Sequence, residues 1–60
     1  MDLRQLRFQK RISQWELSKQ AGVHQSRISL IENGHPAKEE EKIKICKLLE
    51  INPEDVDWSN

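Results

Sequence analysis

The clearest structural signal in the chain lies in residues 14–34, QWELSKQAGVHQSRISLIENG. Its residues favour helix, yet Gly22 lies in the middle, where a glycine would weaken one continuous helix. Glycine adopts a positive φ without Cβ strain, so it can end one helix and turn the chain into the next. The stretch therefore predicts two short helices joined by a tight turn, which is a helix-turn-helix.

The limits of these two helices can be placed from end signals. Ser13 with Glu16 three residues later forms a capping box, which predicts a helix from Gln14 to Gln20 or Ala21. The second helix is expected to start near residue 25 and to end at residues 32–34, where a second glycine follows. The small or apolar residues on the inner faces of the pair are Leu17, Ser18, Ala21, Val23, Ile28 and Ile31.

Three further helices are predicted around this pair. Residues 2–10 place Leu3 and Leu6 on one helical face, and Asp2 can cap the start. Residues 37–50 carry acids first and lysines later, an order that suits the helix dipole, and Pro36 is tolerated in a first helical turn.

The apolar stripe of the 37–50 helix is predicted to be Ile43, Ile45, Cys46 and Leu49. A last short helix is expected over residues 53–57, after an Asn52-Pro53 start, with Val56 facing inward. No segment reads as a strand. The sequence thus predicts an all-α, compact bundle of five short helices that forms a single domain over residues 1–60.

Length and composition narrow the functional classes. A chain of 60 residues with 35% hydrophobic residues can build one small core, and a deep substrate pocket would compete for the same side chains. The zero net charge hides an asymmetry, because residues 1–35 carry net +3 and residues 36–60 carry net −3. A basic half suggests a polyanionic partner, and the alternative is two solvated faces of opposite sign.

Catalytic, metal and membrane signals are weak. His24 and His35 lie on turns without an acid or thiol at ligand spacing, and no positioned base accompanies a serine. Cys46 is the only cysteine and is expected in the core. No apolar run is long enough to span a bilayer, and the N-terminal residues lack the apolar region of a signal peptide. We therefore expect a cytoplasmic protein with no enzyme activity, metal or cofactor.

Two segments carry a family resemblance: ISQWELSKQAGVHQSRISLIENG at residues 12–34 and KICKLLEINPEDV at residues 44–56. They resemble the Cro/repressor-type helix-turn-helix family, also called the lambda-repressor-like fold. The resemblance covers nearly the whole chain. It implies a bundle of four or five helices whose third helix enters the DNA major groove while the second lies across the backbone.

The resemblance also implies site residues. Five side chains at the third helix are candidates for base contacts: Gln25, Ser26, Arg27, Ser29 and Leu30. Glutamine can pair with adenine and serine can donate or accept, whereas Arg27 is assigned either to a guanine or to a phosphate. Candidates for phosphate contacts are Gln14, Asn33, Lys10, Arg11 and His24. Sequence alone rarely separates the two kinds of contact.

A structural ion pair between Arg7 and Glu32 is implied as well, joining the first helix to the end of the third. Three features depart from the family pattern. His24 stands where the family prefers serine or threonine as a helix cap, Trp15 is large for an exposed position, and the KEEEK segment at 38–42 is unusually charged. His24 at this position predicts that the start of the third helix is weaker or sensitive to pH.

These observations predict a sequence-specific double-stranded DNA-binding transcriptional regulator, acting as a repressor on an operator or as an activator that contacts polymerase. Since one unit covers few base pairs, a homodimer is expected, formed in solution or only on DNA. Its interface candidates, which could also be core residues, are Leu48, Ile51, Val56 and Trp58. The alternative interpretation is a protein-interaction module or antitoxin-like regulatory subunit, which the zero net charge favours.

Overall fold

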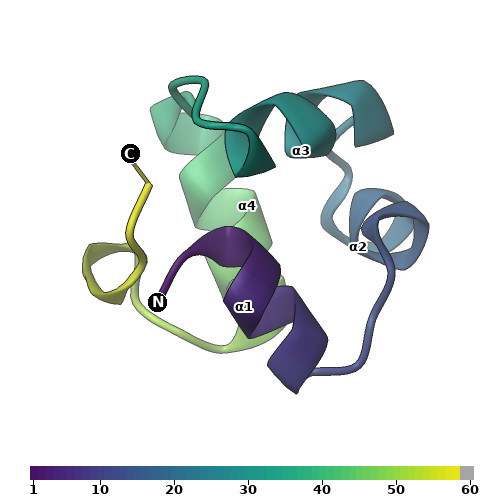
Figure 1. Ribbon diagram of the computed structural model, residues 1–60, viewed down its shortest axis with the longest axis horizontal. Coiled ribbons are helices and arrows are strands. Elements are labelled where there is room, and N and C mark those ends of the chain that lie inside the picture. The colour runs from purple at the N-terminus through teal and green to yellow at the C-terminus, as the bar shows by residue number, and fades with distance from the viewer. Residues whose placement is uncertain (59–60) are drawn as a thin grey trace.

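The computed structural model describes residues 1–58, and within them four α-helices and one short 3-10 turn follow one another (Figure 1). Their bounds are α1 Leu3–Gln9, α2 Gln14–Ala21, α3 Gln25–Glu32, α4 Glu39–Leu49 and η1 Pro53–Asp55. No strand forms in residues 1–58, where the β-type pairing is an isolated parallel bridge between Asp2 and Asp57. The predicted all-α class and the helix-turn-helix of α2 and α3 are confirmed.

The first two helices begin with the caps that the sequence predicted. At α1, an Asp2 carboxylate oxygen accepts from the Gln5 backbone N–H at 2.9 Å, and the Gln5 side chain accepts in return from Asp2 N–H at 3.0 Å. At α2, Ser13 Oγ accepts from Glu16 N–H at 3.0 Å, and Glu16 Oε1 accepts from Ser13 N–H at 3.2 Å. Both reciprocal pairs satisfy backbone donors that a helix start leaves open.

Gly22 makes the turn between α2 and α3. Its backbone is left-handed, with φ 72° and ψ 28°, and its N–H donates to the Ser18 carbonyl at 3.0 Å. A Cβ built at this position would meet no atom within 4 Å. The glycine is therefore required by backbone conformation and not by lack of space.

The core lies where α2, α3 and α4 meet, and it is closed by α1 and the segment after α4. Leu17, Ile28 and Ile45, one from each of the three central helices, have no exposed surface. The other buried hydrophobic residues are Leu3, Leu6, Val23, Ile31, Cys46, Leu49 and Val56. In Figure 1, α3 runs across the upper part of the bundle and α2 lies below its right-hand end. This packing fixes which face of α3 stays outside.

Two predictions for α4 were wrong. The helix begins at Glu39 instead of near Ala37, because Lys38 is extended (φ −73°, ψ 153°) and its N–H donates to the Glu41 carboxylate at 2.8 Å. Pro36 therefore precedes the helix and does not lie in its first turn. Ile43, expected on the apolar stripe, is 55% exposed, because it lies about half a turn away from the buried Ile45.

The predicted fifth helix over residues 53–57 was also wrong in length. The structure has a three-residue 3-10 turn, after which Val56 is extended, although it is buried as expected. The Asp57 N–H donates to the Met1 carbonyl at 2.8 Å instead of continuing a helix. The segment thus ends by pairing with the chain start. The Asn52 side chain makes no capping hydrogen bond.

Candidate nucleic-acid interface

The outer face of α3 is polar and open to solvent. Gln25 and Ser26 are exposed, Ser29 is half-buried and Leu30 is 38% exposed. Residues four apart share a helical face, so these side chains form two adjacent rows opposite the buried Ile28 and Ile31 face. The structure therefore brings four of the five base-contact candidates to one surface; the contacts themselves stay predictions.

His24 caps the start of α3 with its ring. Its Nδ1 accepts from the Ser26 backbone N–H at 3.1 Å and lies 2.8 Å from Ser26 Oγ. The imidazole thus does what a serine or threonine oxygen does at other N-caps. The departure from the family pattern leaves this helix capped. The weaker or pH-sensitive helix start stays a prediction, and the structure adds that the ring itself supplies the cap.

At the other end of α3, the Glu32 carboxylate is fully buried and holds α1, α2 and α3 together. Arg7 donates to it twice, from Nε to Oε2 at 2.8 Å and from Nη2 to Oε1 at 3.2 Å. Gln14 Nε2 donates to Oε1 at 3.0 Å, and Arg4 Nε does so at 3.3 Å. The ion pair that the resemblance implied is present, with two further donors.

The electrostatics of this cluster are set by two opposed causes. Burial raises the pKa of the Glu32 carboxyl, while hydrogen bonds from Arg7, Gln14 and Arg4 lower it, and the net effect is a lowered pKa. The carboxylate therefore stays ionised and paired. Among residues 1–58, no buried side-chain nitrogen or oxygen atom lacks a hydrogen-bond partner. The cluster is a satisfied structural joint.

The Glu32 cluster also positions two phosphate candidates. Gln14, the first residue of α2, commits one N–H of its amide to Glu32 and keeps a second donor. Asn33, directly after α3, accepts from Arg4 Nη2 at 3.5 Å through its side-chain oxygen. The first turn of α2 and the end of α3 are therefore tied through one group of side chains.

Arg27 does not point freely from the outer face of α3. Its Nε and Nη2 donate to the two oxygens of Glu41 at 2.8 and 2.9 Å, and Nη2 also donates to the Pro36 carbonyl at 3.2 Å. Hydrogen bonding from Arg27 lowers the pKa of Glu41 to about 2. Sequence reasoning missed this pair because the partners are 14 residues apart on different helices. A base contact by Arg27 would require it to leave Glu41.

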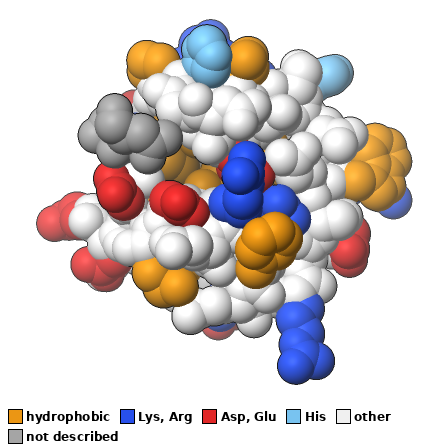
Figure 2. Space-filling view, viewed as in Figure 1, with side chains coloured by type: hydrophobic (Ala, Val, Ile, Leu, Met, Phe, Trp, Pro, Cys, Tyr) orange, Lys and Arg blue, Asp and Glu red, His pale blue; other side chains and the backbone are white. Residues whose placement is uncertain are grey.

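The remaining basic candidates, Lys10 and Arg11, are exposed on the turn after α1. Arg11 has a left-handed backbone with φ 57°. Figure 2 shows blue side chains between α1 and α3 and near the far end of α1, whereas red side chains gather on the left, where η1 lies. The basic and the acidic half of the sequence therefore also occupy different parts of this face.

The dimer-interface candidates lie in or around the core. Val56 is 6% exposed and is a core residue, which removes it as a free contact. Leu48, Ile51 and Trp58 are half-buried and pack against the core. The Trp58 Nε1–H donates to the Pro53 carbonyl at 2.8 Å, so the ring covers the end of the core.

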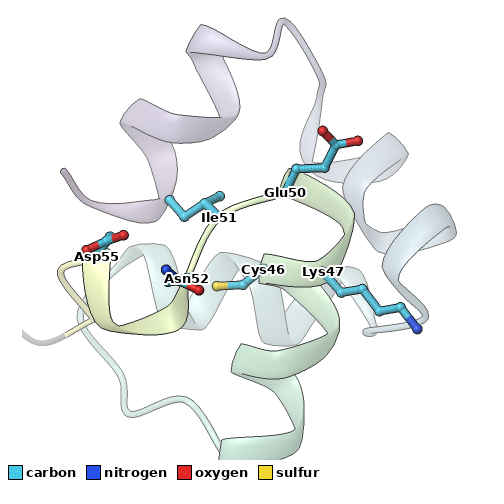
Figure 3. Close-up of a pocket in the computed structure, with 6 residues that line it drawn as sticks. All are labelled: Cys46, Lys47, Glu50, Ile51, Asn52 and Asp55. Carbon is cyan, nitrogen blue, oxygen red and sulfur yellow. The ribbon is translucent and has the colours of Figure 1, made fainter.

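A separate hollow lies where α4 ends, and Figure 3 shows the six side chains that line it. They are Cys46, Lys47, Glu50, Ile51, Asn52 and Asp55. Burial raises the pKa of the Cys46 thiol, which favours the unreactive protonated form. Within residues 1–58, no group of three or more His, Cys, Asp or Glu is arranged to hold a metal ion.

Three further results concern the described helices and the comparisons with known proteins. None of the helices in the described part of the chain combines the length and apolar character needed to cross a bilayer. No curated protein and no solved structure gave a significant match to the chain. A family model described as helix-turn-helix matches residues 3–56, which span α1 through η1. The chain therefore belongs to the Cro/repressor-type family of DNA-binding helix-turn-helix regulators.

Proposed function

We propose that this protein is a cytoplasmic, sequence-specific transcriptional regulator that reads the DNA major groove with α3. The observation that carries the proposal is the two-sided character of this helix. Ile28 and Ile31 anchor it in the core, while Gln25 and Ser26 at its start are exposed. Glutamine can pair with adenine N6 and N7, and a serine hydroxyl can meet any base edge.

Phosphate contacts would place α3 in register on the duplex. Gln14 and Asn33 lie at the two ends of the helix-turn-helix and are tied by the Glu32 cluster, so they can hold the strands that flank the groove. The N-terminus of α2 adds unpaired backbone N–H groups beside the free donor of Gln14. Lys10 and Arg11 would extend this contact along the backbone.

Regulation would follow from occupancy. A bound unit on an operator blocks polymerase, so we propose repression as the mode of action. Two units on half-sites about 34–36 Å apart would supply the specificity that one unit lacks. The half-buried Leu48, Ile51 and Trp58 support a homodimer contact that forms in solution or on DNA.

One observation favours a second function, a protein-interaction module built on the same bundle. The chain has zero net charge, and Arg4, Arg7 and Arg27 in its basic half are engaged with glutamates. Fewer cations then remain for phosphates. A DNA binder weakens steeply with salt because it releases counterions, with a slope of about −0.9 per phosphate neutralised. A protein-interaction module would show no such slope on DNA.

The experiment is selection of binding sites from a random duplex pool, followed by affinity measurements on the selected site at several salt concentrations. We expect a palindromic site and a steep salt slope. Gln25→Ala should relax one position of the site, and Gln14→Ala should weaken all sequences alike. Gln20→Ala, an exposed glutamine of α2, is the matched control and should change neither. No enrichment and no salt-sensitive binding would favour the second function.

A further inference from the structure

The start of α3 holds a hydrogen-bond arrangement that fixes which way a serine proton points. Ser26 presents two groups to the same ring nitrogen of His24. Its backbone N–H is 3.1 Å from Nδ1, and its side-chain Oγ is 2.8 Å from Nδ1. Both residues are exposed, at the edge of the surface that α3 offers to DNA.

The backbone contact determines the form of the imidazole. A backbone amide can only donate, so Nδ1 must carry a lone pair, and the proton of the neutral ring must be on Nε2. The Ser26 Oγ then faces the same lone pair at 2.8 Å, where an oxygen lone pair would be repelled. The contact is attractive only if the hydroxyl donates its proton to Nδ1.

This commitment changes what Ser26 can offer a base. A free serine hydroxyl donates or accepts, and the sequence left both roles open. With its proton held by His24, Oγ is left with two lone pairs and no proton to give. In the major groove, adenine N6 and cytosine N4 are amino donors, whereas guanine and thymine present acceptors.

We propose that His24 is a positioning residue that makes Ser26 select an amino base, adenine or cytosine, over a keto base, guanine or thymine. The selection applies to the base that Ser26 faces on one strand. The inference rests on the proposed DNA-binding function and adds a rule for one position of the operator. The Nε2–H of the same ring remains as a donor for a phosphate, in line with the place of His24 among the phosphate candidates.

The first test needs no DNA. Ring ¹⁵N chemical shifts distinguish the two neutral tautomers, and they can be measured at a pH of about 8.5, where histidine side chains are ordinarily neutral. We expect His24 in the Nε2–H form with a hydrogen-bonded Nδ1, and a shift of that Nδ1 signal in Ser26→Ala. His35 is the internal comparison, because it is exposed and, among the described residues, bonds through its backbone N–H to the Leu30 carbonyl. A His24 ring protonated on Nδ1 would overturn the proposal.

The second test measures base preference. Ser26→Ala identifies the operator position that Ser26 reads, and four duplexes then carry each base there. One neutral hydrogen bond corresponds to about fivefold in affinity, so we expect wild type to prefer adenine and cytosine by about that factor. His24→Ala should reduce this preference below about twofold while lowering affinity for all four duplexes together. In the Ser26→Ala background, His24→Ala should leave the remaining preference unchanged.

The matched control is Ser13→Ala, which removes the side-chain cap of α2 as His24→Ala removes that of α3. Ser13→Ala should lower the affinity for all four duplexes alike and keep the base preference, because Ser13 does not orient a hydroxyl that faces a base. A loss of preference in Ser13→Ala would mean that capping alone explains the effect.

The possible failures are distinguishable. If wild type binds no DNA specifically, the proposed function fails and this inference with it. If wild type binds specifically but prefers guanine or thymine, or keeps its preference in His24→Ala, only this inference fails. The same holds if Ser26→Ala relaxes no position of the site.

Discussion

Two arginine–glutamate pairs hold α3 in place, and they differ in what surrounds them. Arg7–Glu32 and Arg27–Glu41 each make two hydrogen bonds, and each has a shortest distance of 2.8 Å. The Arg7 and Glu32 side chains are 9% and 0% exposed, whereas those of Arg27 and Glu41 are 32% and 10% exposed. The first pair lies inside the joint of three helices, and the second bridges α3 to the start of α4 at the surface.

The comparison shows that two ion pairs with similar hydrogen-bond distances can contribute differently to stability. A charge enclosed by protein loses its hydration, so its partners must satisfy it completely. Glu32 accordingly has additional donors in Gln14 and Arg4. Water can reach the guanidinium of Arg27 and replace a lost partner. We therefore expect the Glu32 cluster to control stability and the Arg27–Glu41 pair to tune the position of α3.

The largest effect is expected for Glu32→Gln. The substitution removes the charge that pairs with Arg7 and places an amide donor among donors, which should cost about 3–5 kcal/mol of unfolding free energy. That is most of the stability of a small domain, so the variant should be largely unfolded at 37 °C. Urea titration followed by circular dichroism measures it. Glu54→Gln, an exposed acid on η1, is the control, and equal losses in the two variants would refute the distinction.

Glu41→Gln should cost less than Glu32→Gln in the same titration. The amide can still accept one hydrogen bond from Arg27, and solvent can hydrate the guanidinium. The variant should stay folded and bind DNA more weakly than wild type, because one of the two ion pairs that hold α3 is weakened. A stability loss as large as that of Glu32→Gln would show that the two pairs do not differ as their burial indicates.

The stability contributions of the two ion pairs should also differ in their dependence on acidic pH. The folded-state pKa of Glu41 is about 2, below its ordinary value of 4.5, so its contribution is present above pH 4.5 and is lost as pH falls toward 2. The stability difference between wild type and Glu41→Gln should therefore shrink over this window. Because the pKa of Glu32 is also lowered, Glu41→Gln should keep part of the acid sensitivity. Thermal unfolding from pH 7 to pH 2 measures both, and a constant difference would contradict the assignment.

The smallest effect is expected for Arg4→Ala. The Arg4 side chain is 48% exposed, and its contact with Glu32 is 3.3 Å. The loss should be below about 1 kcal/mol, since exposed ion pairs contribute little and Glu32 keeps Arg7 and Gln14. Arg7→Ala is the comparison and should be far more destabilising. Similar losses of stability for the two arginines would mean that the number of positive charges near Glu32 matters and that the burial of each arginine does not.

Most of the fold was predicted from short sequence patterns of neighbouring residues. Ser13 with Glu16 and the glycine at position 22 mark features that depend on a few neighbouring residues, and the structure confirms them. The α4 start was wrong because the bond from the Lys38 N–H to the Glu41 carboxylate, three residues later, was not read from the sequence. The 53–57 segment was wrong because a distant backbone bond, from Asp57 to Met1, ends the turn.

The site was predictable in its surfaces and not in its contacts. The two exposed rows of side chains on α3 follow from helical spacing around the buried Ile28 and Ile31. The pairing of Arg27 with Glu41 depends on how α3 crosses α4, which periodicity does not encode. The cap at His24 depends on the reach of one ring to Ser26, and residue preferences at caps gave no hint of it.

The central claim is that α3 and the residues tied to its ends form the DNA-binding surface. The most direct measurement is a ¹H–¹⁵N NMR titration of the protein with its selected duplex and, separately, with a scrambled one. We predict that the selected duplex shifts the amide signals of residues 13–15, 24–30 and 33–34, and that changes at Leu48 and Ile51, where we propose the homodimer contact, appear only together with these shifts. Shifts centred on residues 46–55, with α3 unchanged, would contradict the account.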